Sequence, residues 1–180
     1  RFREVPGLGV VRAEIAARSP ALLQHDPTKI VLALPGTGAD GQIVSHELEE
    51  QGITLEFADR DTFCPVITLA DTPATVERMV EAVIAGIERH RGAPRPLVPL
   101  TSWTVAPETV LSPRDAFFSA HERVPVAAAI GRVAAEMICP YPPGIPAIAP
   151  GERIRAEILE ALQAEAASGT RIAYCGDPQL

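Results

Sequence analysis

The stretch from Cys139 to Glu152 constrains the fold of this chain more than any other. It reads Cys-Pro-Tyr-Pro-Pro-Gly-Ile-Pro-Ala-Ile-Ala-Pro-Gly-Glu and holds five of the chain's 18 prolines and two of its 13 glycines. Proline fixes φ, removes a backbone donor and pushes the residue before it toward extended conformations. We therefore expect an extended, stiff ribbon, the proline ribbon, with turns at Pro143-Gly144 and Pro150-Gly151.

Side chains within the proline ribbon predict that it packs against a body. Tyr141, Ile145 and Ile148 lie between its prolines, whereas a free tether would be polar. We expect Tyr141 to be an anchor, Gly144 to sit at positive φ or against another backbone, and Glu152 to provide negative charge at the start of the following helix. An ordinary rigid connection between two elements remains the alternative.

Three motifs occur in order near the C-terminal end. The ribbon motif comprises Tyr141, Pro142, Pro143, Gly144 and Pro146, followed by Gly151 and Glu152. Upstream of it stand Ser112-Pro113-Arg114-Asp115-Ala116-Phe117-Phe118 and, after Val124-Pro125, Gly131-Arg132-Val133-Ala134-Ala135-Glu136-Met137. Together they resemble the C-terminal part of the bacterial ornithine/lysine/arginine decarboxylases. The resemblance covers residues 110–155 strongly and residues 25–70 more loosely.

The resemblance implies an architecture, because these decarboxylases are pyridoxal-phosphate enzymes of the aspartate-aminotransferase fold, fold type I. Residues 1–91 would be the small domain of that fold, residues 92–109 a Pro-rich linker, and residues 110–180 the decarboxylase C-terminal domain. The large cofactor-binding domain of the family lies upstream of the matched region, so we expect it to be absent here. The chain begins at Arg1 without Met, and we expect that a preceding part has been removed.

The apolar patterns predict an α/β (α+β) fold in two subdomains. Runs of strand length occupy residues 30–34, 53–59 and 64–70, and the last two predict an antiparallel pair. Helical patterns occupy residues 41–51, 73–90 and 152–167, with a short helix after Ser112-Pro113 and a last strand at 172–174. Residues 126–138 are ambiguous, because their alanines favour a helix, whereas the family resemblance implies a short helix followed by a strand. We expect small, mainly antiparallel sheets with helices packed on one side.

The pattern also predicts the position of several individual side chains. Ile43, Val44 and Leu48 are expected to face the core from the helix at 41–51. Thr72 is the expected N-cap of the helix at 73–90. Trp103, inside the linker, is expected to be an anchor packed on a neighbouring segment. The glycine-rich segment 35–41 resembles a phosphate cradle only superficially, and a turn feeding a helix is the favoured interpretation.

Charge and composition exclude some classes of partner. The net charge is −7, the arginines are scattered, and Lys29 is the single lysine, so neither nucleic acid nor an anionic membrane is an expected partner. Apolar residues make up 47% of the chain but aromatic residues only 4%, which predicts an aliphatic core. The sequence shows neither a signal peptide nor an apolar run of membrane-spanning length.

The three cysteines are far apart. Cys64, Cys139 and Cys175 have no C-x-x-C spacing, so we expect reduced thiols and a cytoplasmic location instead of a disulfide framework or a zinc site. No histidine stands at a spacing that predicts a catalytic triad. The cysteine spacing also leads us to expect no metal.

A pyridoxal-phosphate enzyme needs a lysine for the Schiff base, a carboxylate for the pyridinium nitrogen and a phosphate pocket. In the family the lysine follows a Ser-x-His pattern, whereas Lys29 follows Asp26-Pro27-Thr28. Lys29 is instead expected to pair with a carboxylate such as Asp26. We predict no catalytic residue and no bound cofactor in this chain alone, with pyridoxal phosphate present in the full-length enzyme.

Two acids are candidate substrate ligands. Gly52-Ile53-Thr54-Leu55-Glu56 resembles the family segment in which an acid after Gly-Ile meets the distal amine of the substrate. Glu56 and Asp59 are the candidates, and because they are three residues apart a regular strand would place them on opposite faces. The alternative is that both are solvated acids at the end of a strand.

The resemblance implies the C-terminal portion of a basic amino-acid decarboxylase that forms a polyamine or diamine. This portion would shape the substrate site and the dimer, with the large domain, a second copy and a basic amino acid as partners. The alternative is a stand-alone, non-catalytic module that pairs with a full-length decarboxylase and regulates it. The residues leave open which basic amino acid is used.

Overall fold

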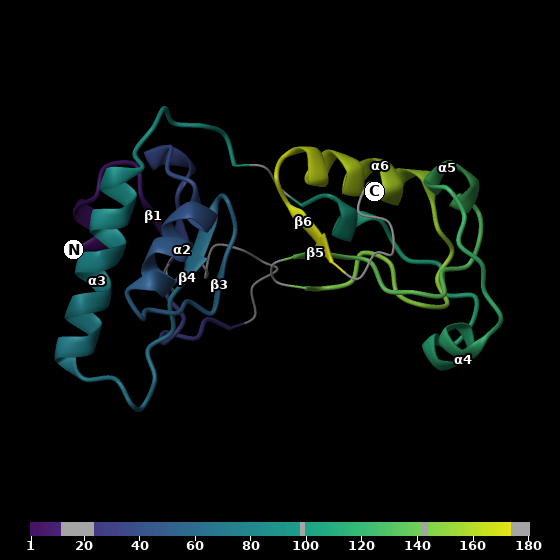
Figure 1. Ribbon diagram of the computed structural model, residues 1–180, viewed down its shortest axis with the longest axis horizontal. Helices are drawn as coiled ribbons and strands as arrows, with labels where there is room; N and C mark the ends of the chain where they lie inside the picture. Colours follow the sequence, from purple (N-terminus) through teal and green to yellow (C-terminus); the bar gives the residue numbers. More distant parts are fainter. Residues whose placement is uncertain (12–23, 98–99, 142–143, 174–180) are drawn as a thin grey trace. The chain divides into compact units, whose positions relative to one another are not determined.

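A computed structural model of the chain describes residues 1–11, 24–97, 100–141 and 144–173 (Figure 1). The chain divides into two compact units, Arg1–Leu97 and Val98–Leu180. Residues 92–109, expected to form a linker, contribute to both units. Gly92 and Arg95 donate backbone hydrogen bonds to Thr37 and Pro35 in the first unit, whereas Ser102 bonds a helix of the second.

The first unit is built around a four-stranded sheet with the strand order β1-β2-β4-β3. Its elements are η1 (Phe2–Glu4), β1 (Gly9–Val10), β2 (Leu32–Ala33), η2 (Pro35–Thr37), α2 (Gly41–Glu50), β3 (Phe57–Ala58), β4 (Thr62–Cys64) and α3 (Pro73–Arg89). Every neighbouring pair is antiparallel, as predicted for the strands now seen as β3 and β4, but β4 shares only Cys64 with the strand predicted at residues 64–70. The strands are shorter than predicted, and Pro65, which has no N–H, follows β4 directly.

Capping residues set the helix ends of the first unit. The Thr72 hydroxyl accepts a hydrogen bond from Thr75 N in a reciprocal capping box, and Pro73 occupies the first turn of α3, as predicted. Asp40 caps α2, and Gly52 follows it at φ +72°. Ile43 was expected in the core but is 51% exposed. Adjacent helical residues differ by 100° in direction, so only Val44 and Leu48, four apart, share the buried face.

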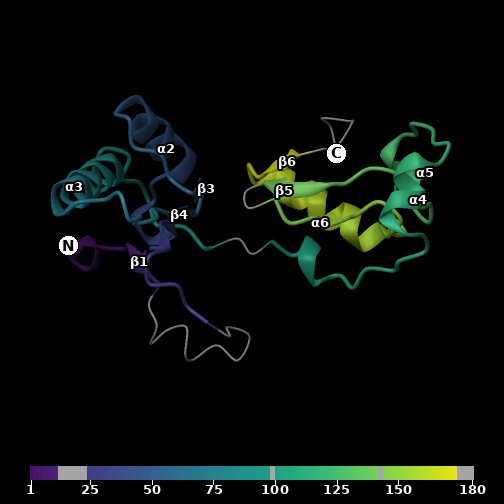
Figure 2. The same ribbon diagram turned by 90° about the horizontal axis from the view of Figure 1, so that it is seen from below.

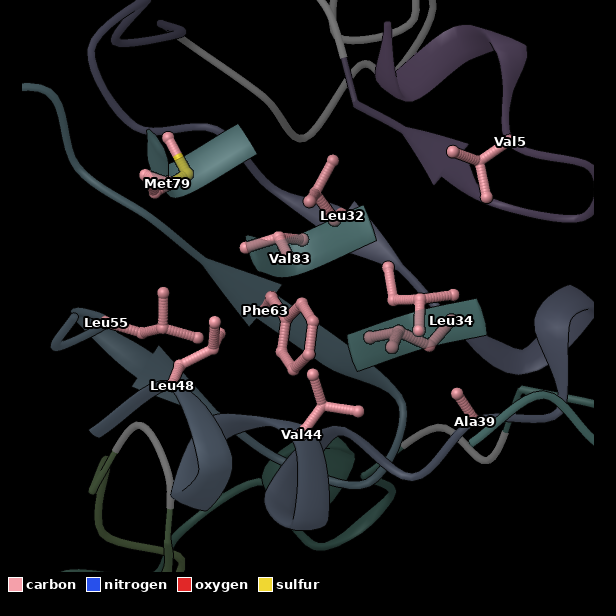
Figure 3. Close-up of a cluster of buried hydrophobic side chains, with 11 residues drawn as sticks. Val5, Leu32, Leu34, Ala39, Val44, Leu48, Leu55, Phe63, Met79 and Val83 are labelled. Carbon is pink, nitrogen blue, oxygen red and sulfur yellow. The ribbon is translucent and has the colours of Figure 1, made fainter. Parts of the chain in front are cut away.

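The core of the first unit lies between the sheet and the two helices, which pack beside each other (Figures 2 and 3). It is aliphatic except for Phe63, as the composition predicted. Its buried members are Val5, Leu32, Leu34, Ala39, Val44, Leu48, Leu55, Phe63, Met79, Val83 and Ile87. Gly86 of α3 brings the helices close, because a Cβ there would lie 2.6 Å from Val44 Cγ1 of α2.

The second unit combines short helices with a two-stranded antiparallel sheet (Figure 1). Its elements are η3 (Ser102–Thr104), α4 (Pro113–Phe118), α5 (Val126–Ala129), β5 (Cys139–Tyr141), α6 (Ala156–Ala167) and β6 (Arg171–Ala173). The Ser112 side chain caps α4, which confirms the predicted short helix. In the core of the second unit, three side chains of α6 pack against buried residues of the segment that precedes it. The cluster comprises Ala134, Ile138, Ala147, Ile148, Ile158, Leu159 and Leu162.

Helix α6 begins at Ala156, later than the predicted start at residue 152. The intervening backbone is occupied by non-local hydrogen bonds: Arg153 N donates to Glu108 O at 2.9 Å, and Ile154 N donates to Arg132 O at 2.8 Å. Residues held in such bridges cannot also take helical dihedrals, so the helix starts only after them. Gly169, at φ +97°, follows its C-terminal end as predicted.

Candidate functional site

The candidate site lies at one end of the four-stranded sheet, near the C-terminal end of β4. Strands β2 and β3 both run antiparallel to β4, one on each side of it, so the residues that precede them lie at the same end of the sheet. Lys29 precedes β2 and forms a bridge with Val66, whereas Glu56 precedes β3 and donates its N–H to Cys64 O at 3.0 Å. The strand order thus brings Lys29 and Glu56 to either side of the end of β4.

Lys29 and Glu56 form an ion pair at this end of the sheet. The Lys29 Nζ lies 2.8 Å from Glu56 Oε1, and the two side chains are 47% and 46% exposed. The hydrogen bond to Glu56 raises the pKa of the Lys29 ammonium, with burial opposing the rise and Cys64 and Asp26 adding to it. Lys29 thus pairs with a carboxylate, as expected, but the partner is Glu56 and not Asp26, whose Oδ1 accepts from the N–H and hydroxyl of Thr28.

Asp59, the second candidate acid, is held in the turn between β3 and β4. Its Oδ1 accepts hydrogen bonds from Asp61 N at 2.7 Å and Thr62 N at 2.6 Å, and its Oδ2 accepts from the Thr62 hydroxyl at 2.7 Å. An aspartate that bonds the backbone two and three residues ahead stabilises a turn. The structure therefore leaves Glu56 facing solvent beside an ammonium, while the Asp59 carboxylate is engaged within its own loop.

The same turn also contains a buried carboxylate that the sequence patterns did not single out. Asp61 is 6% exposed and pairs with two guanidinium groups. Arg60 binds it through Nε and Nη2 at 3.0 Å each, and Arg95 lies 3.0 Å from its Oδ1. Arg95 also donates to Ala39 O and Arg60 O. Because Arg95 is 34 residues from Asp61, no local sequence pattern could have revealed the pair. Through its bonds to Asp61, Ala39 and Arg60, the Arg95 side chain holds residues 92–97 against the rest of the first unit.

The glycine-rich segment 35–41 is a closed turn, as the favoured interpretation predicted. Its N–H groups are used internally: Thr37 N donates to Leu34 O, Gly38 N to Pro35 O, and Ala39 N to the Thr37 hydroxyl. A Cβ on Gly38 would lie 2.3 Å from the backbone of Gly92. Such close backbone contact leaves no row of free donors to cradle a phosphate.

The proline ribbon folds back on itself and is not one extended segment. Ile138 N donates to Ile148 O at 2.9 Å, and Ala147 N donates to Ile138 O at 2.9 Å. Pro142 and Pro143 lie outside the described residues, as does the turn predicted at Pro143-Gly144 apart from Gly144 itself. Gly144 has φ +87°, within the predicted conformation, and Pro146 is exposed.

Three side chains of the ribbon region differ from their predicted roles. Tyr141 is 43% exposed, and its ring lies 5.7 Å from the Arg171 guanidinium, so it is a surface cation–π partner and not a buried anchor. Ile145, expected to be buried, is 54% exposed, while Ile148 is fully buried. Glu152 does not serve the next helix, which starts four residues later; its carboxylate accepts from Ala149 N at 2.8 Å.

Two residues fix the ribbon to the second unit. Gly151, at φ +92°, lies against Leu111, whose carbonyl oxygen would be 2.3 Å from a Cβ placed there. Trp103 packs against the apolar cluster and donates from Nε1 to Ile145 O at 3.0 Å, as expected of an anchor. The ribbon is therefore held by contacts on both sides of its turn.

Cys64 and Cys139 are buried, and burial raises the pKa of both thiols. Cys175 lies outside the described residues. In the part of the chain that the structure describes, three or more His, Cys, Asp or Glu side chains nowhere gather to hold a metal ion. Across the same residues, no helix has the length and apolar character needed to cross a membrane.

Comparisons with known proteins agree on one family. Residues 100–172 match the family model described as Orn/Lys/Arg decarboxylase, C-terminal domain. An arginine decarboxylase of Bacillus subtilis is 32% identical over 161 residues, covering 87% of this chain and 32% of that protein. A lysine decarboxylase of Pseudomonas aeruginosa is 29% identical over 178 residues, covering 71% of this chain and 24% of that protein. The chain thus spans about a third of the length of the curated relatives it matches, or less.

Solved structures support the same fold. The lysine decarboxylase of Francisella novicida superposes with a TM-score of 0.65 at 23% identity, covering 86% of this chain and 30% of that chain. The shared architecture is the one described above, small antiparallel sheets with helices packed against them.

Proposed function

Because this chain belongs to the Orn/Lys/Arg decarboxylase family, we propose that it is the C-terminal portion of a basic amino-acid decarboxylase in which Glu56 binds the distal cation of the substrate. The observation that carries the proposal is the Lys29–Glu56 pair: a half-exposed carboxylate already holds a primary ammonium at 2.8 Å. Free lysine and ornithine end in the same chemical group. A cationic side chain entering a site needs such a counter-charge with hydrogen-bond geometry.

The described residues do not fit pyridoxal phosphate, the cofactor that the family resemblance implies. A Schiff-base lysine needs a readily deprotonated amine, whereas the bond to Glu56 raises the pKa of Lys29, the single lysine. The donors of the turn at 35–41 are also used internally. We therefore propose that another part of the enzyme binds the cofactor, and that this chain supplies binding and orientation at the far end of the substrate.

The proposal predicts a loss of selectivity on removal of the Glu56 charge. In the longest native polypeptide that contains this chain, Glu56→Gln should weaken the preference for basic over neutral amino acids by about 1.5–3 kcal/mol, the scale of a hydrogen bond to a charged group. Glu50→Gln, which alters an exposed acid of α2, is the matched control. Unchanged kcat/KM for lysine, ornithine and arginine in the Glu56 variant would contradict the proposal.

The length of the native polypeptide separates the two forms of the proposal. Intact-mass analysis should find a chain longer than 180 residues if this is a decarboxylase portion, and a chain of about this length if it is a stand-alone module that pairs with a full-length enzyme. The 180-residue chain alone, mixed with pyridoxal phosphate, should neither decarboxylate amino acids nor form a stoichiometric covalent adduct at Lys29. We place the enzyme in the cytoplasm as a homo-oligomer, following the family resemblance and the sparse cysteines.

A further inference from the structure

On the basis of the function proposed for Glu56, we propose that the Lys29 ammonium binds the Glu56 carboxylate in place of the substrate cation when the site is empty. Lys29 would thereby set which cation the site prefers. Lys29 neutralises the Glu56 carboxylate when the site is empty and competes with the arriving substrate for it. The residue is a specificity determinant of the binding step; no covalent chemistry is assigned to it.

The two carboxylate oxygens of Glu56 are not equivalent. Oε1 accepts the hydrogen bond from Lys29 Nζ at 2.8 Å. Among the described residues, Oε2 accepts no hydrogen bond, and Glu56 keeps 46% of its side-chain surface exposed. A second cation can therefore approach Oε2 from solvent while Lys29 still occupies Oε1.

Displacement of Lys29 is easy because the pair is exposed. Water and salt screen such ion pairs, so they contribute little compared with buried ones. A displaced ammonium also keeps a favourable neighbour, since the nearby Asp26 carboxylate favours its charged form. The Asp26 Oδ1 oxygen is bonded to Thr28, but Asp26 remains exposed and negatively charged beside the lysine.

The chemistry of the arriving cation decides how much Lys29 matters. A primary ammonium, as in free lysine or ornithine, can bind through Oε2 alone. A guanidinium, as in free arginine, binds a carboxylate best through two parallel hydrogen bonds and so needs both oxygens. Lys29 should therefore penalise a guanidinium more than an ammonium, and its removal should shift the preference toward arginine.

The single lysine provides a direct reporter. Labelling the 180-residue chain with lysine carrying nitrogen-15 at Nζ gives one side-chain ammonium signal, that of Lys29. Glu56→Gln gives the reference position for an unpaired Lys29. Unlabelled free arginine, which needs both carboxylate oxygens, should move the signal toward that reference further than free lysine or ornithine does, whereas norleucine, or sodium chloride at equal ionic strength, should not move it. No difference between the basic amino acids and the salt control would overturn the inference.

Kinetics of the native polypeptide test the specificity claim. Lys29→Gln should lower KM for arginine up to about five-fold more than KM for lysine, the range expected of an exposed pair. Lys29→Met, which also removes the ammonium but keeps an aliphatic side chain, should shift the ratio of the two KM values in the same direction as Lys29→Gln. An unchanged ratio in Lys29→Gln, with selectivity still lost in Glu56→Gln, refutes the role of Lys29 alone. No effect of Glu56→Gln refutes the proposed function itself.

Discussion

Ser102 binds the buried carboxylate of Glu165 through two hydrogen bonds, from its backbone N–H to Oε1 and from its hydroxyl to Oε2, each 2.9 Å long. Ser102 and Glu165 are 1% and 2% exposed. The contact fastens η3, and with it Trp103, to α6. A residue of the expected linker is therefore part of the core of the second unit.

Glu165→Ala should destabilise the chain by about 2–4 kcal/mol, because it leaves two buried donors of Ser102 without an acceptor and opens a cavity. Glu165→Gln keeps one acceptor oxygen and should cost less, about 1–2 kcal/mol. Urea unfolding of the 180-residue chain measures both variants. Equal stability of Glu165→Ala and the wild type would show that the contact contributes nothing to the fold.

Alanine substitutions at two glycines with positive φ, Gly169 and Gly151, distinguish the cost of backbone strain from the cost of a steric clash. Gly169→Ala, at φ +97° in open space, should cost about 1–2 kcal/mol through strain alone. Gly151→Ala, at φ +92°, adds a Cβ 2.3 Å from Leu111 O and should cost more, at least about 3 kcal/mol. The comparison uses thermal and urea unfolding of the same chain. If the two variants are equally stable, the close contact between Gly151 and Leu111 is not tight in solution.

Asp61→Asn should destabilise the first unit by about 2 kcal/mol. The substitution removes the carboxylate charge that pairs with both the Arg60 and the Arg95 guanidinium groups, which are 28% and 22% exposed. The cost should fall below that of a fully buried pair because water still reaches both arginines. Protease cleavage between residues 92 and 97 should also become faster, since Arg95 fastens this segment. Unaltered cleavage would contradict that role.

Glu47 should make stability sensitive to acid. A hydrogen bond with His90 lowers the pKa of Glu47 below its ordinary value, and Arg89 at its other oxygen contributes further. A carboxylate with a lowered folded-state pKa stabilises the fold above its unfolded-state pKa, and that contribution is lost as the pH falls through the folded-state value. Glu47→Gln should therefore be less stable than the wild type at neutral pH, and the gap should close below about pH 4.

The pH prediction is checked by urea unfolding midpoints of both proteins at stepped pH. Glu160→Gln, which removes an exposed carboxylate from α6, controls for the change in net charge. A gap between Glu47→Gln and the wild type that stays constant down to acid pH would mean that the Glu47–His90 contact does not couple proton binding to folding.

Local chemistry was enough to predict α2, α3 and α4, together with the caps at Thr72 and Ser112. Thr72 and Ser112 each bond a backbone N–H three residues ahead, and Gly169 takes a conformation that other residues avoid, so their positions depend on adjacent residues alone. The turn at Asp59 had a local signal as well, an aspartate three residues before a threonine, which points to a turn and not to a ligand.

Strand limits and the start of α6 depended on partners far along the chain. Residues 152–154 have a helical pattern but are bridged to residues 108, 132 and 134, and that pairing overrides the local preference. Ile43 and Ile145 are apolar yet exposed because burial depends on which face meets another element. Hydrophobic pattern alone does not specify that face.

The candidate site likewise depends partly on local sequence and partly on partners that are distant along the chain. The sequence by itself determined that Glu56 stands after a Gly-Ile pair and that the chain has a single lysine, Lys29. Only the tertiary structure decided that these two meet, because Lys29 has Asp26 three residues away and Glu56 27 residues away. The antiparallel pairing of β4 with both β2 and β3 makes Glu56, and not Asp26, the ion-pair partner of Lys29. Strand order is a non-local property that no short stretch of sequence encodes.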